Sequence, residues 1–427
     1  MPKNKKPAAR KSGASPEDLA EAHAQKICDL ALDLAEREEG EEGEEGEGKE
    51  MSGALKEMQL EFQKMIKKCL LQKKDEVLYD ALERTRYADI DAYQFVKQAI
   101  EEASEVILSR RDDGPVHEVN AFVIPVFVRS MGGLHAQQSF QDQEAFDLLS
   151  NSFQSAQLES ADATVVLVSY AYHLDEIDRI TYSQIYEMTR DAQAAMSGKK
   201  NAGIEATERS FSGWPANRFA PGDAALEIRF LLGFALKSMD DPFYQIPQDE
   251  AASDAYFEAR EQRFQQWTVQ AAPLVKRCLV MGGGVGEDGD GDADSDVGAH
   301  GRVLDVDFLY QDLFHGAKER GIAEYFLLQM VSELNGALGE QAIAPHATKA
   351  VIGPADVGHE MVLRVNLYAM TGPALLASAA KPFGETADLQ LEADDVRDAL
   401  RGIGVESFSL ALKFDSNGAP VDVRPFN

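Results

Sequence analysis

Apolar residues in the first quarter of the chain recur with the spacing of packed helices. Between residues 51 and 110 they are separated by alternating steps of three and four, which places them on one helical face. Two such seams are formed by Leu55, Met58, Phe62, Met65 and Cys69, and by Tyr93, Val96, Ile100, Ala103 and Ile107. The spacing predicts two or three helices packed as an antiparallel hairpin, with a polar break at residues 84–87. A dimerisation coiled coil is the alternative.

An amphipathic helix is predicted ahead of these seams. Ser15 can cap it, Pro16 suits its first position, and Ile27 and Leu34 lie on its apolar stripe. The helix leads into residues 38–47, a tract of Glu and Gly in which like charges repel, so we expect a flexible linker there. Residues 1–14 are basic and are predicted to be disordered.

After residue 116 the pattern changes to short β-branched and aromatic segments that alternate with helical ones. Strands are predicted at residues 119–128, 164–172, 279–281, 303–310, 346–352, 361–370, 375–381, 406–414 and 420–423. Helices are predicted at residues 144–153, 182–195, 224–239, 251–275, 312–319, 322–338 and 391–400. Pro125 cannot donate a ladder hydrogen bond, so its strand is expected at a sheet edge or with a bulge.

These elements predict an α/β or α+β protein in which an N-terminal helical segment precedes two mixed αβ lobes, with helices packed on sheets. The expected boundaries are residues 1–50 for a disordered or amphipathic acidic tail, 51–116 for the helical segment, 117–275 for the first lobe, 276–301 for an acidic flexible linker and 302–427 for the second lobe. The two lobes have similar lengths and element contents, so a distant internal duplication is an open alternative.

The net negative charge of the chain limits the kinds of molecule that it is expected to bind. The 427 residues include 42 Lys and Arg and 73 Asp and Glu, a formal charge of 42 − 73 = −31. Phosphates are repelled by such a chain, so neither nucleic acid nor an anionic membrane surface is an expected partner. A basic protein is the partner that this charge favours.

Cysteine usage and hydropathy bear on the compartment. Cys28, Cys69 and Cys278 are widely spaced, so neither a thiolate zinc motif nor a disulfide framework is predicted. The basic N-terminus is not followed by an apolar run, and no stretch approaches the roughly 20 apolar residues of a membrane span. We expect a cytoplasmic protein, and no motif indicates a cofactor.

Alternating carboxylates offer a weak candidate metal site at Asp288, Asp290, Asp292, Asp294 and Asp296. Calcium prefers several oxygen ligands, but a calcium-binding EF-hand that starts at Asp288 requires Gly at position 293 and Glu at position 299, where this chain has Ala293 and Ala299. A disordered acidic insertion is the preferred interpretation, and weak binding of Ca²⁺ or Mg²⁺ remains the alternative.

A second acidic pair, Asp305 and Asp307, lies on one face of a predicted strand because side chains alternate with a period of two. With Asp312 and His315 it could supply the ligands of a metal-dependent hydrolase that acts on a phosphorylated substrate. A strand with a solvent-facing polar side explains the same pattern.

The segment LDVDFLYQDLFHGAKERGIAEYFLLQMVSELNGAL, residues 304–338, resembles part of an uncharacterised bacterial family that is known only as a domain of unknown function. The resemblance rests on Phe314, Gly316, Glu319, Arg320 and Glu324 and on the Leu/Met stripe, and it would extend over most of residues 50–427. It implies a cytosolic bacterial protein of unassigned role, and it transfers no site residue.

Two hypotheses for function follow from these patterns. The first is an acidic interaction or regulatory protein without catalytic activity, which the two acidic tracts and the incomplete catalytic motifs favour. The alternative is the hydrolase that would act through Asp305, Asp307, Asp312 and His315. Carboxylates that converge in a cleft would favour the enzyme, and carboxylates that face solvent would favour the interaction protein.

Overall fold

The computed structural model of the protein describes residues 15–42, 53–110, 116–130, 142–158, 163–196, 226–239, 247, 249–279, 303–309, 312–358, 360–383 and 387–426. The disorder predicted for residues 1–14 and for the acidic insertion lies outside these ranges, and so do the calcium candidates Asp288, Asp290, Asp292, Asp294 and Asp296. Helix α1 (Pro16–Glu42) includes the first residues of the tract that is predicted to be a linker.

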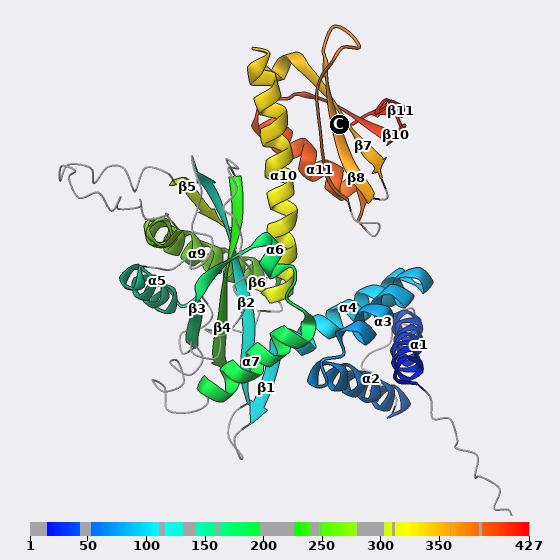
Figure 1. The fold of residues 1–427 in the computed structure, drawn as a ribbon, viewed down its shortest axis with the longest axis vertical. Helices are drawn as coiled ribbons and strands as arrows, with labels where there is room; N and C mark the ends of the chain where they lie inside the picture. The colour runs from blue at the N-terminus through cyan, green and yellow to red at the C-terminus, as the bar shows by residue number, and fades with distance from the viewer. Residues whose placement is uncertain are drawn as a thin grey trace, which may run out of the picture.

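Four N-terminal helices pack around one apolar core and form the helical lobe (Figure 1). They are α1, α2 (Gly53–Leu71), α3 (Asp75–Ala88) and α4 (Ile90–Glu105). Both predicted seams contribute to this core, for example through Phe62 and Ile100. Ile27 and Leu34 of α1 are buried in the same core, so α1 packs with the helices that follow it.

The breaks between these helices differ from the one predicted at residues 84–87. Helix α3 continues through these residues, where Thr85 Oγ1 is buried and donates to the carbonyl oxygens of Ala81 and Leu82 at 2.9 and 3.0 Å. The chain turns at Asp89, whose carboxylate accepts a hydrogen bond from Ala92 N at 2.8 Å and caps α4.

The first sheet is antiparallel throughout, and its long strand β2 is central. Its strands are β1 (Val106–Arg110), β2 (Val116–Ser130), β3 (Thr164–His173), β4 (Leu226–Ser238), β5 (Val303–Phe308) and β6 (Asp312–Leu313). β4 lies along one side of β2, while β1, β6 and β5 follow one another along the other side. β2 carries a register shift to β5 between Arg129 and Ser130, which is the bulge or irregularity expected as the alternative to an edge. Pro125 itself does not lie at a sheet edge, because β2 has strands on both sides. Its carbonyl accepts a hydrogen bond from Leu309 N at 3.1 Å, between the segments paired with β6 and β5.

Three further assignments from the sequence are wrong. Residues 106–110 form β1 and residues 226–238 form β4, although both are predicted to be helical, and Leu279 ends a helix rather than beginning a strand. β4 lies between β2 and β3 and is buried on both faces. A strand of this kind shows no period of two, so its apolar run does not differ from that of a buried helix.

Helices cover both faces of the first sheet (Figure 1). α5 (Gln143–Ala156) and α9 (Glu250–Leu279) pack on one face, around Phe122, Phe153 and Trp267. α7 (Tyr182–Met196) and the first half of α10 (Phe314–Glu340) pack on the other face. The short helix α6 (Leu174–Ile177) follows β3 directly.

The C-terminal lobe contains a five-stranded sheet with the order β11-β10-β7-β8-β9. Its strands are β7 (Thr348–Val357), β8 (Glu360–Ala369), β9 (Leu375–Pro382), β10 (Ser407–Phe414) and β11 (Pro420–Pro425), and the 3-10 helix η2 (Pro345–Ala347) precedes them. α11 (Leu389–Gly402) and the second half of α10 cover one face. Helices and largely antiparallel sheets in both lobes confirm the α+β class. The two sheets do not share one topology, because β7 and β10 are parallel and the strand pairs of the first sheet are antiparallel.

α10 is one helix that packs on both sheets, whereas the sequence predicts a break between residues 319 and 322. Gly321 does not end a helix but permits close packing, because a Cβ there would lie 2.7 Å from side-chain atoms of Pro125. On the predicted core face, Met330 and Leu334 are buried, and Phe326 is only half-buried. β5 and β6 pair with β2, so residues 303–308 and 312–313 join the first sheet rather than the lobe expected to begin at residue 302.

No helix within the described ranges is both long enough and apolar enough to cross a membrane.

The contact at Gly321 predicts opposite effects of one substitution at two positions of α10. Gly321→Ala should lower the free energy of unfolding by about 1–3 kcal/mol, because the added methyl group meets Pro125 and Phe230. Gly336→Ala, in the same helix with no atom within 4 Å of the added Cβ, should raise it by up to about 1 kcal/mol through helix propensity. Urea unfolding of both variants tests this pair, and a gain in stability for Gly321→Ala would contradict the close packing.

Candidate functional site

Asp305 and Asp307 lie on one face of β5, as the alternation predicts, and both are exposed. The Oδ1 atom of each accepts a hydrogen bond from the backbone N–H of the following residue, at 3.0 and 2.9 Å. Asp305 lies opposite Arg129 of β2, and Asp307 lies opposite Phe127.

The other two candidate hydrolase residues lie elsewhere. Asp312 pairs with Val123 of β2, whereas Asp305 pairs with Arg129. These two β2 residues are six positions apart, so Asp312 and Asp305 are separated by roughly 20 Å along the strand. His315 is buried in the first turn of α10, where its Nε2 lies 3.0 Å from Ser104 Oγ. Among the described residues no group of three or more His, Cys, Asp and Glu side chains could hold a metal ion. The four candidates therefore do not form one cluster.

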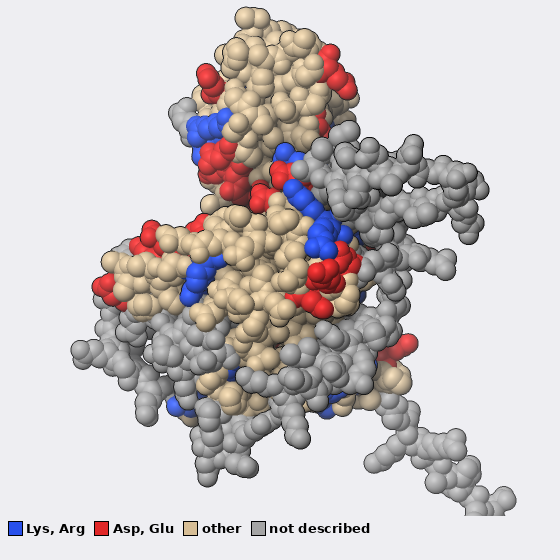
Figure 2. All heavy atoms as spheres, turned by 90° about the vertical axis from the view of Figure 1, so that its left-hand side faces the viewer, with Lys and Arg blue, Asp and Glu red and all other residues tan. Residues whose placement is uncertain are grey.

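Asp307 instead belongs to an acidic surface shared by three elements. We call this surface the acidic face, and it consists of Asp305 and Asp307 of β5, Glu324 of α10, and Glu392, Asp394, Asp395 and Asp398 of α11. Burial raises the pKa of Glu324, and Asp395 and Asp307 raise it further against the opposing effect of Lys381. Figure 2 shows carboxylates gathered where the C-terminal lobe meets the rest of the molecule.

Part of the acidic face is neutralised and part is not. Lys381 pairs with Glu392, and Arg397 lies 2.5 Å from Asp394 and 3.1 Å from Asp398. Within the described residues, ion pairs are absent at four carboxylates, those of Asp305, Asp307, Glu324 and Asp395. These four carry the uncompensated negative charge of the face.

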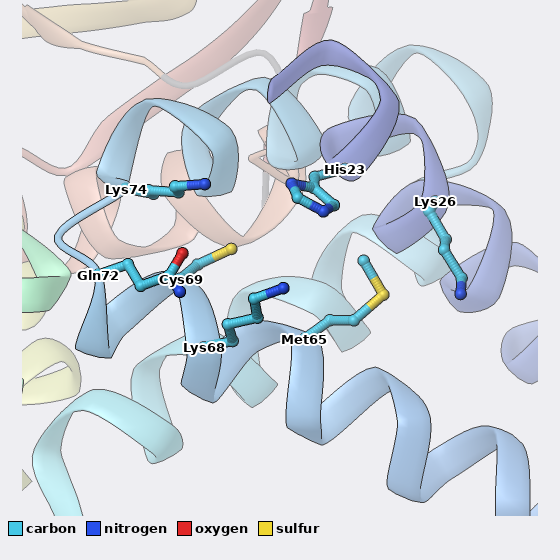
Figure 3. Close-up of a pocket in the computed structure, with 7 residues that line it drawn as sticks. All are labelled: His23, Lys26, Met65, Lys68, Cys69, Gln72 and Lys74. Atoms are coloured by element: carbon cyan, nitrogen blue, oxygen red, sulfur yellow. The ribbon is translucent and has the colours of Figure 1, made fainter. Parts of the chain in front are cut away.

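A pocket of opposite charge lies on the helical lobe, between α1, α2 and the start of α3 (Figure 3). We call it the basic pocket; it has a volume of about 220 Å³, and its lining residues are His23, Lys26, Met65, Lys68, Cys69, Gln72 and Lys74. In Figure 3 the ammonium groups of Lys68 and Lys74 and the sulfur of Cys69 point toward the space beside His23. Lys26 points away from this space and pairs with Glu61.

The turn between α2 and α3 places Lys74 beside Cys69. Lys74 N donates to Cys69 O at 3.0 Å, and Lys73 N donates to Leu70 O at 3.2 Å. These two bonds form a Schellman motif, in which Lys73 occupies the left-handed position at φ 54° that glycine usually takes. The backbone of this turn, rather than a flexible loop, therefore positions one wall of the pocket.

Burial and the positive charge of the pocket lower the pKa of the histidine that lines it, His23. Burial lowers the pKa of His23, and the positive charges of Lys74, Lys68 and Lys26 lower it further. Neither Lys68 nor Lys74 makes an ion pair with any described residue. The pocket is therefore a positively charged site in a strongly acidic chain.

A cluster of lysines in the sequence indicates this pocket, independently of the apolar seam of the same helix. Residues 64–74 contain five lysines and no acidic residue, although acidic residues outnumber basic ones in the whole chain. The seam predicts the burial of Met65 and Cys69, but it does not predict that α1 brings His23 to the same place.

Two polar clusters of the β3–β4 region have structural roles. Arg229 Nη2 lies 3.1 Å from Glu227 Oε2 inside the first sheet, with both side chains almost fully buried. His173 caps α6, because its Nδ1 accepts a hydrogen bond from Asp175 N at 3.2 Å while Glu176 closes the capping box. Burial, with the nearby Arg229, lowers the pKa of His173 to about 4.

The comparison with protein families shows where this chain belongs. The model of a family described as a protein of unknown function, DUF2863, matches residues 49–285, which is more than half of the 427 residues. The chain therefore belongs to this family, and the resemblance to a domain of unknown function is confirmed. Residues 304–338, which carry that resemblance, lie outside the match, as does the acidic face. No curated protein and no solved structure matches the chain.

Glu101 lies at the contact between α4 and α10 and shares Lys97 with Glu319. Lys97 Nζ lies 2.7 Å from Glu319 Oε2 and 3.8 Å from Glu101 Oε1. Burial raises the pKa of Glu101 to about 7; Lys97 opposes the shift and Glu319 adds to it. In the folded protein the Glu101 carboxyl group therefore stays protonated at pH values at which a glutamate is ordinarily ionised.

The pKa of Glu101 predicts a pH-dependent effect of its removal. The unfolded chain releases the proton near pH 4.5 and the folded protein near pH 7, so ionisation lowers stability as pH rises through this window. Glu101→Gln should therefore raise the free energy of unfolding by about 1–3 kcal/mol more at pH 8 than at pH 5. Urea unfolding at both pH values measures this, with the exposed Glu83→Gln as control. Equal effects of Glu101→Gln at both pH values would contradict the assignment.

Proposed function

We propose that this protein is a non-enzymatic interaction protein that binds a basic segment of another protein through its acidic face. The observation that carries the proposal is that, within the described residues, Asp305 and Asp307 of β5, Glu324 of α10 and Asp395 of α11 make no ion pair. Glu324 lies near enough to Asp395 and Asp307 for both to add to the burial that raises its pKa. Carboxylates that crowd together repel one another, and a lysine- or arginine-rich partner would relieve that repulsion.

The arrangement of the face supports a protein partner with several cations. Its carboxylates belong to one strand and two helices, so they are held on ordered elements rather than on a loop. Asp305, Asp307 and Asp395 are exposed and accessible to a partner. Opposite charges on two proteins increase the rate of encounter and fix orientation, and this effect falls with rising salt.

We also propose that the protein works in the cytoplasm. Cys28, Cys69 and Cys278 are free thiols buried in the structure, and free thiols are typical of reducing compartments.

Removing charge from the face should weaken the binding of a basic peptide. The probe is a fluorescent peptide of six alternating Lys-Gly pairs, and the variant is Asp305→Asn, Asp307→Asn and Asp395→Asn combined. We expect its affinity for the peptide to fall about tenfold at low salt, because three close carboxylates are lost. Fluorescence anisotropy measures the change.

A matched control separates the face from the net charge of the chain. Asp33→Asn, Glu57→Gln and Glu83→Gln combined change the charge by the same amount at exposed positions of the helical lobe. This control should change the affinity for the peptide less than about twofold. A control that weakens binding as much as the face variant would refute a specific acidic face.

The same carboxylates test the hydrolase alternative. Calorimetric titration with Mn²⁺ should detect no stoichiometric micromolar site that depends on Asp305 and Asp307, because neither residue lies with Asp312 or His315. A site that is present in the wild-type protein and disappears in Asp305→Asn/Asp307→Asn would overturn the non-enzymatic proposal.

A further inference from the structure

The basic pocket has the charge and the shape of a site for a small organic anion. It lies on the helical lobe, whereas the acidic face lies between β5, α10 and α11, so the two proposals are independent. We propose that the pocket binds a compact phosphate monoester, with the phosphoryl group at Lys68 and Lys74 and an apolar body over Cys69 and Met65.

The charge of the pocket matches a dianion. Three lysines line it, and one of them, Lys26, is neutralised by Glu61, which leaves two ammonium groups. The nearby Asp75 does not pair with Lys74, because its carboxylate accepts hydrogen bonds from Thr181 and Ser183 at the N-terminus of α7. Two ammonium groups held close together repel each other, and a phosphoryl dianion would compensate both.

The floor of the pocket is apolar and sulfur-rich. Cys69 is 5% exposed and Met65 is half-buried, and both lie on the face of α2 that packs into the helical lobe. Thiol and thioether sulfur atoms make favourable contacts with aromatic rings. An anion with a flat apolar body therefore fits better than a bare inorganic ion.

The volume limits the size of the ligand. A cavity of about 150 Å³ accommodates benzene, so the basic pocket, at about 220 Å³, has room for one six-membered ring and a phosphoryl group. Gln72 and His23 lie at the same opening and supply polar groups beside the two lysines. A large nucleotide or a lipid with two chains would extend from this space into solvent.

Calorimetric titration of the full chain with four probes tests the proposal. Phenyl phosphate should bind at one site. Inorganic phosphate, which lacks the apolar body, and benzoate, which has one charge, should each bind at least about tenfold more weakly. Benzyl alcohol, which has no charge, should give no measurable heat. Equal affinity for inorganic phosphate, tighter binding of benzoate, or no heat from phenyl phosphate would each overturn the proposal.

Variants locate the binding in the pocket. Lys68→Gln and Lys74→Gln should each weaken phenyl phosphate about tenfold, whereas Lys67→Gln, an exposed neighbour that does not line the pocket, should leave its affinity unchanged within about twofold. A loss for Lys67→Gln as large as that for Lys68→Gln would show that only the general positive charge of α2 attracts the anion. Circular dichroism of each variant confirms the fold.

Met65→Ala separates the contribution of the apolar body from that of the charge. It should weaken phenyl phosphate about fivefold but leave the affinity for inorganic phosphate unchanged, because it removes only the contact with the ring. Equal losses for both ligands would indicate a distorted pocket and would overturn the assigned orientation of the ligand.

Discussion

Two carboxylates of the helical lobe, Asp75 and Glu105, accept hydrogen bonds at the N-termini of helices that cover the first sheet. Asp75 accepts from Ser183 N at 2.8 Å at the start of α7, and Glu105 accepts from His315 N at 2.9 Å at the start of α10. The first backbone N–H groups of a helix have no partner within it, and a carboxylate there also compensates the helix dipole. The N-cap residue of α10, Leu313, has no side-chain oxygen, so the cap comes from a residue distant in sequence.

These two capping contacts join the helical lobe to α7 and α10, and we call them the joint. The joint fixes where both candidate sites lie. Tyr182 contacts Tyr79 of α3 and the ring of His315, so aromatic packing supports the same contact. Because α10 continues from this joint to the second sheet, it holds Glu324 between β5 and α11, where the acidic face forms. At the start of α3, Lys74 directly precedes Asp75, so the hydrogen bonds of Asp75 also restrain one wall of the basic pocket.

Segregated charge is the feature that the two candidate sites have in common. The chain has a formal charge of −31. Among the residues that the structure describes, two lysines around an apolar floor have no ion-pair partner, and carboxylates without one gather on another surface. Neither arrangement stabilises the fold by itself, since crowded like charges raise its free energy. The binding roles that we propose, for a basic partner at one surface and an organic anion at the other, would explain why such charges are held on helices and strands.

The sequence by itself determined a mixed protein of the α/β or α+β class, the apolar seams of α2 and α4 and most strands of the C-terminal lobe, because periodicity reflects which side of an element is buried. It did not determine that residues 226–238 form a strand, since burial on both faces erases that periodicity. The shared strand face of Asp305 and Asp307 was predictable, but their separation from His315 was not. Sites made by α1 with α2, or by β5 with α10 and α11, depend on contacts between distant segments. Only the tertiary structure decides such contacts, because local spacing carries no information about which elements pack together.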